Sequence, residues 1–239
     1  MPKNIQVFCF SYAGGTASFF DCIENDLPDY SLVKLEYSGH GSRYKEQLYH
    51  NFYELSEDLY NMIKSKYNGN DYALFGYSMG TISLVEVLRR IVEDDQMPLP
   101  CCVFLAAHEP HTKSELVGFQ SDELDEWVKE RTIKFGGVPD DLIENNSFWR
   151  VYLPLYRADY SLIGSYNFEE LEFSAAIPAT IFYSETDTRY EDMRDWENVF
   201  TGGIEYYSFV GNHFFINDHH TALAQIIKLQ MDRSVIYDV

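Results

Sequence analysis

Positive charge and long apolar segments are both scarce in this chain. Its 239 residues include 18 Lys and Arg against 38 Asp and Glu, which gives a formal net charge of −20. Binding to nucleic acid or to an anionic membrane surface depends on positive charge, so we expect neither as a partner. There is no apolar run long enough to span a bilayer and no charged-then-apolar start of the signal-peptide type. We therefore expect a cytoplasmic protein.

Cysteine is also rare. Cys9, Cys22, Cys101 and Cys102 show no Cys-x-x-Cys spacing, and three of them lie in apolar runs that are typical of strands. Reduced cysteine in such a run packs as a small hydrophobe. The sequence therefore predicts core thiols, and it does not indicate a metal site.

What the chain does have is a regular alternation of short β-branched or aromatic runs with helical patterns. This alternation predicts an α/β protein, with a mainly parallel sheet and helices on both of its faces. A chain of this length usually forms one core, so we expect a single domain over residues 1–239. The expected strands are Ile5–Phe10, Ser31–Tyr37, Tyr72–Phe75, Cys101–Ala107, Ala179–Tyr183 and Glu205–Val210, and the expected helices are Phe19–Leu27, Tyr53–Lys66, Ile82–Val92 and Ala222–Met231.

Between the fourth and fifth expected strands lies a long section, about residues 111–176, with several helical patterns in place of one crossover helix. Apolar residues recur there at helical spacing, as at Leu124, Val128 and Ile133, and a later pattern is rich in aromatic residues. So much aromatic surface favours an inserted helical lid that shapes an acyl pocket. The alternative is a set of ordinary helices that cover the sheet.

The motif Gly76-Tyr77-Ser78-Met79-Gly80 lies where an expected buried strand is followed by an expected helix. A nucleophile elbow, the tight turn that exposes a catalytic serine hydroxyl, occurs in this context. The amide of Met79, at the start of the helix, then faces the carbonyl oxygen that Ser78 attacks. The alternative is a glycine-rich turn with a surface serine.

A serine nucleophile needs a histidine base, and the base needs a carboxylate that orients it. In this architecture the chain order is serine, acid, histidine. His213 follows the last expected strand and precedes the last helix, which is the right place in that order. Asp187, after the strand Ala179–Tyr183, is the favoured acid, and Glu109, after the preceding strand, is its rival.

The other histidines fit the role of the base less well. His108 and His111 follow a strand and could line the pocket, but neither comes after a proposed acid. His40 belongs to a glycine turn. The alternative for His213 itself is a loop histidine with a purely structural role.

The loop after the first expected strand reads Phe10-Ser11-Tyr12-Ala13-Gly14-Gly15. Its two glycines let the backbone approach a substrate closely, so the amide of Ala13 is the expected second donor to an oxyanion. A glycine-rich loop after a strand can instead bind phosphate. This one has neither a Gly-x-Gly-x-x-Gly fingerprint nor a Lys-Ser/Thr ending, which disfavours nucleotide binding.

Taken together, these residues resemble the stand-alone type II thioesterases that accompany nonribosomal peptide and polyketide synthases. The lid segments discriminate best, because generic esterases share the triad but not the run Pro-x-x-Arg-Ala-Asp. The matching segments extend nearly end to end: Ala13–Gly15, Gly39–Gly41, Gly76–Gly80, Phe135–Pro139, Leu153–Tyr160, Asp187 and His213–Phe215.

The resemblance implies an α/β-hydrolase fold with a mobile lid and a triad of Ser78, Asp187 and His213. It implies substrates that are acyl thioesters on the phosphopantetheine arm of acyl or peptidyl carrier protein domains, and an editing role that clears misprimed or stalled acyl groups. Thioester hydrolysis of this kind requires no metal and no cofactor beyond that arm, and we expect a monomer. The alternatives are a carboxylesterase or lipase without a carrier partner and a non-catalytic hydrolase-fold module that binds a ligand.

The chain departs from the family pattern at three loop positions. Ser38 and Ser11 stand where proline is usual, and Asn212 stands where glycine precedes the histidine. These changes retain every catalytic group. Carrier proteins are themselves commonly acidic, so a net charge of −20 calls for a local basic patch, for which Arg89 and Arg90 are candidates.

Overall fold

The computed structural model describes residues 5–94, 96–110 and 121–236. Its centre is one sheet of parallel strands in the order β2-β1-β3-β4-β5-β6. All six expected strands are present, and their ends differ from the expected ones by two residues or fewer. The strands are β1 (Ile5–Phe10), β2 (Tyr30–Leu35), β3 (Tyr72–Tyr77), β4 (Cys102–Ala106), β5 (Ala179–Tyr183) and β6 (Ile204–Ser208).

Helices follow most of the strands. The α-helices are α1 (Asp21–Glu24), α2 (Phe52–Lys66), α3 (Met79–Glu93), α4 (Ser121–Phe135), α5 (Asn146–Ser165), α6 (Tyr190–Met193) and α7 (Ile216–Ile236). Short 3₁₀ helices are η1 (Ala17–Phe20), η2 (Gly41–Arg43), η3 (Asp140–Leu142), η4 (Phe168–Glu170) and η5 (Arg194–Asn198).

Three of the expected helices differ from the observed ones, and the simplest case is Ile82–Val92, because α3 begins three residues earlier, at Met79. The expected helix Phe19–Leu27 is a 3₁₀ turn followed by the short helix α1, and Pro28 disfavours helical geometry at the residue before it. The expected helix Ala222–Met231 is part of the longer α7, which begins at Ile216 and has non-helical dihedral angles at His219. The buried Phe215 and Ile216 extend the apolar pattern toward the loop that precedes the helix.

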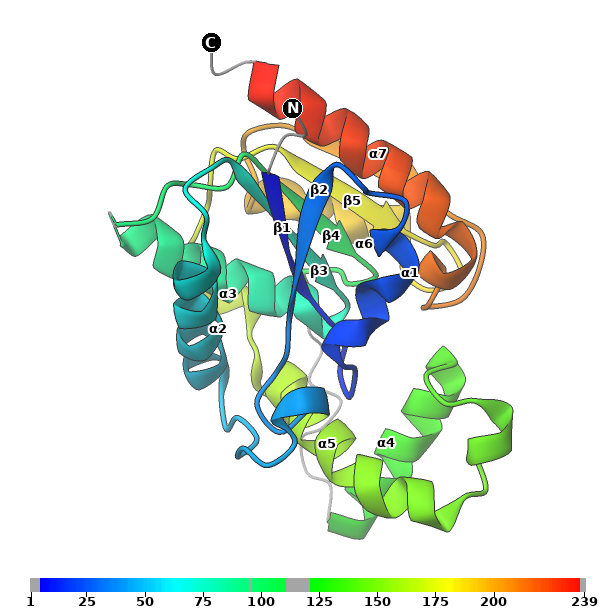
Figure 1. Cartoon of the computed structure of the whole chain (residues 1–239). Coiled ribbons are helices and arrows are strands. Elements are labelled where there is room, and N and C mark those ends of the chain that lie inside the picture. The colour runs from blue at the N-terminus through cyan, green and yellow to red at the C-terminus, as the bar shows by residue number, and fades with distance from the viewer. Residues whose placement is uncertain (1–4, 95, 111–120, 237–239) are drawn as a thin grey trace.

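The sheet is covered on both faces, as the sequence predicts. Helices α2 and α3 lie on one face, and α1 and α7 lie on the other (Figure 1). Successive strand side chains point to opposite faces. In β1, Phe8 and Phe10 join the core beneath α2 and α3, while Val7 and Cys9 join the core beneath α7. All four cysteines are free thiols.

Helices α4 and α5 lie beyond one end of the sheet and form a lobe with a small core of its own (Figure 1). The fully or nearly buried members of that core are Val128, Val138, Trp149, Tyr156 and Tyr160. These helices correspond to the expected lid, whose first ten residues, 111–120, lie outside the described part of the chain. Across the residues described, we find no helix with the length and apolar character needed to cross a bilayer.

Candidate active site

Ser78 occupies the tight turn between β3 and α3. Its backbone has φ 55° and ψ −121°, a conformation that L residues rarely adopt and that costs about 1–3 kcal/mol. Hydrogen bonds on both sides hold it there: the Ser78 amide donates to the Ala106 carbonyl at 2.8 Å, and the Thr81 amide donates to the Ser78 carbonyl at 2.8 Å. The turn therefore presents the serine hydroxyl at the carboxyl end of the sheet.

The two glycines of the motif permit this turn. A Cβ on Gly76 would collide with the carbonyl oxygen of Gly80, where α3 begins its first turn. A Cβ on Gly80 would collide with the carbonyl oxygen of Phe10, at the end of β1. Strand β3, strand β1 and helix α3 thus approach one another more closely than any side chain at these positions would allow.

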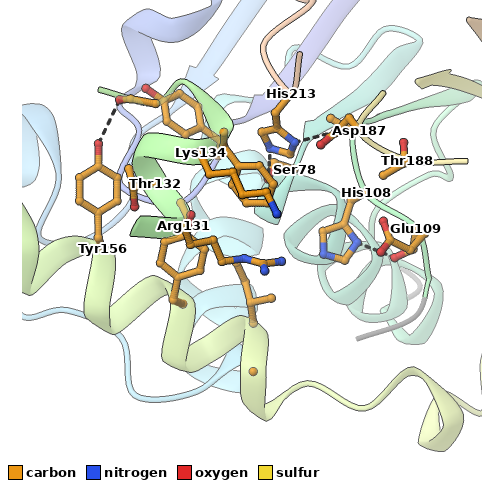
Figure 2. Close-up of a pocket in the computed structure, with 18 of the residues that line it drawn as sticks. Ser78, His108, Glu109, Arg131, Thr132, Lys134, Tyr156, Asp187, Thr188 and His213 are labelled. Atoms are coloured by element: carbon orange, nitrogen blue, oxygen red, sulfur yellow. Dashed lines mark hydrogen bonds and ion pairs between the residues drawn. The ribbon is translucent and has the colours of Figure 1, made fainter. Parts of the chain in front are cut away.

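The structure brings Ser78, His213 and Asp187 together (Figure 2). Ser78 Oγ lies 2.9 Å from His213 Nε2, and His213 Nδ1 lies 2.8 Å from Asp187 Oδ2. A carboxylate only accepts hydrogen bonds, so His213 Nδ1 carries the proton and Nε2 accepts from the serine hydroxyl. Ser78 and His213 are only 9% and 8% exposed, so water screens these bonds little.

The rival acid, Glu109, also lines the cavity, but the carboxylate that meets His213 is that of Asp187. His108, which precedes Glu109 in the chain, donates a hydrogen bond from Nδ1 to the Glu109 carbonyl oxygen at 2.6 Å. Burial lowers the pKa of His108, which keeps this second cavity histidine neutral near pH 7. His111 lies outside the described residues.

The histidine loop is held by contacts that our sequence analysis did not identify. The hydroxyl of Tyr77, beside the nucleophile, donates to the His213 carbonyl at 2.7 Å. Burial raises the pKa of Tyr77 well above its usual value, so the hydroxyl stays protonated and able to donate. On the other side, the Ser184 hydroxyl donates to the Gly211 carbonyl at 2.5 Å. In the sequence Tyr77 appears only as a variable position of the Gly-x-Ser-x-Gly motif, which gives no sign of the role of its hydroxyl.

The two expected oxyanion donors differ in how the structure places them. Ala13 lines the same cavity as Ser78, and none of the residues described accepts a hydrogen bond from its amide. Met79 is the first residue of α3, where an amide has no partner within the helix, and its side chain is buried. The structure does not place Met79 among the residues that line the cavity.

The cavity has a volume of about 620 Å³, which is in the range of small-molecule sites. Lid residues Arg131, Lys134 and Tyr156 line the same cavity as the triad (Figure 2). The aromatic lid side chains on its wall are Trp127, Phe135, Tyr156 and Tyr160. The lid therefore supplies the apolar surface that an acyl chain would contact.

The loop residues that depart from the family pattern are accommodated by local hydrogen bonds. Asn212 Oδ1 accepts from the Phe214 amide at 2.9 Å, and the Ser38 hydroxyl donates to the Gln47 carbonyl at 2.6 Å. Ser11 is the exception, because its hydroxyl is buried and has no hydrogen-bond partner among the residues described. None of these contacts displaces Ser78 or His213 from the cavity wall.

The two arginines suggested as a basic patch are engaged within the protein. Arg89 pairs with Glu86 at 3.1 Å on the same helix. Arg90 lies over the ring of Tyr53, 4.3 Å from its centroid, and donates to the Ser56 hydroxyl at 2.8 Å. Much of their hydrogen-bonding capacity is therefore used within α2 and α3.

Comparisons with known proteins extend over nearly the whole chain. The family profile described as a thioesterase domain matches residues 5–231. The medium-chain S-acyl fatty acid synthase thioesterase of Homo sapiens is 27% identical over 220 residues, which cover 90% of this chain and 82% of that protein. The gramicidin S biosynthesis protein GrsT of Aneurinibacillus migulanus is 23% identical over 231 residues, which cover 95% and 89% of the two chains.

Solved structures agree with the fold. The crystal structure of ClbQ from the colibactin NRPS/PKS pathway superposes with a TM-score of 0.86 at 25% identity, and the match covers 98% of this chain and 99% of that one. The expectation of an α/β-hydrolase fold is therefore confirmed.

Proposed function

The chain belongs to the thioesterase family, and we propose that it hydrolyses acyl thioesters on the phosphopantetheine arms of carrier proteins with Ser78, His213 and Asp187 as its catalytic residues. The observation that carries this proposal is the continuous hydrogen-bonded path from Ser78 Oγ through His213 to Asp187 on the wall of a lid-covered cavity. A hydrolase-fold module that only binds ligands has no need of all three groups in this geometry.

In the first step, His213 Nε2 accepts the Ser78 proton while Oγ attacks the thioester carbonyl carbon. The carbonyl oxygen becomes an oxyanion, which the amides of Met79 and Ala13 stabilise. The tetrahedral intermediate collapses as the carbon–sulfur bond breaks, leaving an acyl ester on Ser78. The thiol of the pantetheine arm leaves with the proton from His213. Because thiols have a pKa near 8.5, this leaving group needs less help than an amine would.

In the second step, water attacks the acyl ester. His213 now accepts a proton from that water, and the second oxyanion occupies the same site. Collapse releases the carboxylic acid and returns the proton to Ser78 Oγ. Asp187 stabilises the imidazolium in both steps, since it is buried and bonds directly to His213 Nδ1.

Carrier-bound substrates fit both the family and its named relatives. One relative is a fatty acid synthase thioesterase, and others belong to gramicidin S and colibactin biosynthesis. We propose an editing role in nonribosomal peptide or polyketide synthesis, with carrier domains of a synthetase as partners. The phosphopantetheine arrives with the substrate, so the enzyme needs no metal and no cofactor of its own.

We further propose that the protein acts as a monomer in the cytoplasm. Its four free thiols suit a reducing compartment, and its net charge of −20 opposes self-association. Light scattering at several concentrations tests the first part, since a mass that rises toward that of a dimer would contradict it.

The identity to the human medium-chain enzyme favours a second candidate, release of a finished fatty acid from a fatty acid synthase. Both candidates use the same chemistry, and they differ in the acyl group and in the carrier. An editing enzyme accepts short acyl groups such as acetyl on a peptidyl carrier. A chain-releasing enzyme discriminates against acetyl and favours medium chains.

The decisive test is the intact mass of phosphopantetheinyl carrier proteins loaded with acetyl or decanoyl groups, measured after incubation with the enzyme or with Ser78→Ala. Loss of the acetyl mass only with the wild-type enzyme supports editing, and loss of decanoyl alone supports chain release. Cleavage of p-nitrophenyl esters without cleavage of either carrier substrate would point to a carboxylesterase. Full activity of the Ser78→Ala variant would overturn the triad.

A further inference from the structure

A second buried histidine–carboxylate pair lies on the lid side of the active site. Asp159, on the lid helix α5, is 2% exposed, and His40, in the turn after β2, is completely buried. Asp159 Oδ2 lies 3.0 Å from His40 Nε2. The same oxygen accepts a hydrogen bond from the Gly14 amide at 2.6 Å. One lid carboxylate thus bonds both to the body of the protein and to the loop that contains Ala13.

The hydrogen bonds of His40 indicate that this pair is ionic. His40 Nδ1 lies 3.0 Å from the Ser38 carbonyl oxygen, which only accepts, so Nδ1 carries a proton. Nε2 faces a carboxylate and carries the other proton. Burial acts to lower the pKa of His40, but the Asp159 carboxylate and the Ser38 carbonyl outweigh it, and the pKa lies above its usual value.

A buried ion pair gains little net stability, because desolvating both charges offsets their attraction. The location of this pair suggests another role. Tyr156, one helical turn before Asp159, places its ring directly against Gly14, where a Cβ would collide with it. Gly14 has φ 74°, which favours glycine. Helix α5 therefore contacts the loop at Gly14 twice, with an aromatic ring and with a carboxylate.

These contacts determine where the Ala13 amide points. The Gly15 amide donates to the Tyr12 carbonyl at 3.0 Å, which turns that carbonyl toward the inside of the loop. In a trans peptide the N–H points away from the C=O, so the Ala13 N–H points the opposite way. The peptide that follows Ala13 is held by the bond from the Gly14 amide to Asp159. Ala13 is thus fixed on both sides, and one of the two restraints comes from the lid.

We infer that Asp159 and His40 are positioning residues that couple the docking of lid helix α5 to the placement of the Ala13 amide, so that the oxyanion site is complete only when α5 is docked. This inference rests on the proposed function, since it assigns a purpose to the Ala13 amide. His40 holds the carboxylate in place, and Asp159 transmits that position to the loop. Neither side chain contacts the substrate.

The test compares Asp159→Asn and Asp159→Ala with Asp125→Asn. Asp125 is also a lid carboxylate, but its ion-pair partner, Arg157, lies within the lid. The substrate is a soluble acyl-N-acetylcysteamine thioester, which removes any effect of carrier docking. One oxygen of Asp159 accepts both hydrogen bonds, so asparagine keeps an acceptor oxygen in that place but loses the charge, which weakens both bonds, whereas alanine removes both. Circular dichroism and urea unfolding confirm that each variant is folded under the assay conditions.

Loss of a whole oxyanion donor lowers kcat by about 10²–10³-fold. We expect a misplaced donor to cost less, with kcat falling about 10-fold in Asp159→Asn and about 50-fold in Asp159→Ala. KM should change less than about threefold, because the ground-state thioester uses the amide weakly. A trifluoromethyl ketone that forms a tetrahedral adduct on Ser78 should lose affinity in parallel with kcat. A lid anchor without a positioning role would lower the urea midpoint and leave kcat and inhibitor affinity unchanged.

The inference is overturned if either folded Asp159 variant keeps kcat within about twofold of Asp125→Asn. If Asp159→Ala does not fold, Asp159→Asn decides the outcome. A failure of the proposed function gives a different result, because the wild-type protein would then cleave neither the soluble thioester nor a loaded carrier.

Discussion

The ring of Phe135, at the end of lid helix α4, stacks on the ring of His213, with centroids 4.5 Å apart and ring planes inclined by 23°. The guanidinium of Arg131, one turn earlier, lies 4.9 Å from the centroid of the Phe135 ring. Gly136 follows with φ 80°, and a Cβ there would lie 2.9 Å from Asn212 Nδ2. The end of α4 therefore rests directly on the loop that holds the catalytic base.

This contact predicts that Phe135→Ala lowers kcat for thioester hydrolysis by about 10-fold. An aromatic face against a partly desolvated cation contributes about 1–2 kcal/mol, and His213 becomes a cation as it accepts the Ser78 proton. Steady-state kinetics on a soluble thioester measure the effect. Phe148→Ala is the control, because Phe148 stacks on Tyr152 within the lid and does not line the cavity. Equal losses in the two variants would show that only lid stability matters.

Two carboxylates near the histidine allow a direct test of the acid. Asp187→Asn should lower kcat by about 10⁴-fold, since an amide at that position favours the wrong tautomer of the histidine. Glu109→Gln should change kcat by less than about threefold, because the carboxylate that meets His213 is that of Asp187. Both rates are measured on the same soluble thioester. The reverse order of effects would give the role of the acid to Glu109.

Tyr77 and Tyr72 form a natural pair for a third prediction. Each is a buried tyrosine whose hydroxyl donates to a backbone carbonyl, that of His213 at 2.7 Å for Tyr77 and that of Pro98 at 2.6 Å for Tyr72. Phenylalanine at either position leaves a buried carbonyl without its donor and should lower the free energy of unfolding by about 1–3 kcal/mol. Only Tyr77→Phe should also lower kcat, by about 3–10-fold, because only its carbonyl belongs to the catalytic loop.

Urea unfolding and steady-state kinetics on both variants measure these effects. The prediction fails if Tyr77→Phe keeps the wild-type kcat while it loses stability, because the hydroxyl would then have no part in placing His213.

There is a physical reason why the sequence predicted the sheet and named Ser78, Asp187 and His213, which the structure brings together. Strands buried on both faces read as continuous apolar runs, and the elbow needs glycine at Gly76 and Gly80 wherever strand and helix approach so closely. Ser78, Asp187 and His213 then come close together because the carboxyl ends of parallel strands meet at one edge of the sheet. Each of these signals is local in the chain.

The contacts that sequence reasoning missed are those between distant segments. Asp159 and His40 are 119 residues apart, and although Asp159 ends the Pro-x-x-Arg-Ala-Asp run that was matched to the family, nothing local in that run indicates which residue it contacts. His40 was interpreted only as part of a glycine turn. Phe135 was matched as a family segment, but its contact with His213 depends on how the lid docks. Periodicity indicates which face of a lid helix is apolar and does not indicate what that face meets.

The Asp159–His40 pair makes a prediction about pH and stability. The groups that face His40 are the Asp159 carboxylate, the Ser38 carbonyl and, more weakly, the Glu36 carboxylate, and together they raise its pKa above the unfolded value of about 6.5. A raised folded-state pKa contributes stability that is fully present below the unfolded pKa and is lost as the pH rises through the folded pKa. The stabilisation by His40 should therefore be largest near pH 6 and decline toward pH 9.

His40→Gln removes this contribution, so the difference in unfolding free energy between wild type and variant should be about 3–5 kcal/mol at pH 6 and smaller at pH 9. Urea unfolding at both pH values measures it. His220→Gln is the control, because His220 pairs with Asp26 at 2.6 Å near the surface, where such a pair contributes about 1 kcal/mol or less. A His40→Gln difference that stays constant from pH 6 to pH 9 would mean that folding leaves the His40 pKa unshifted, and the buried pair would then not be ionic.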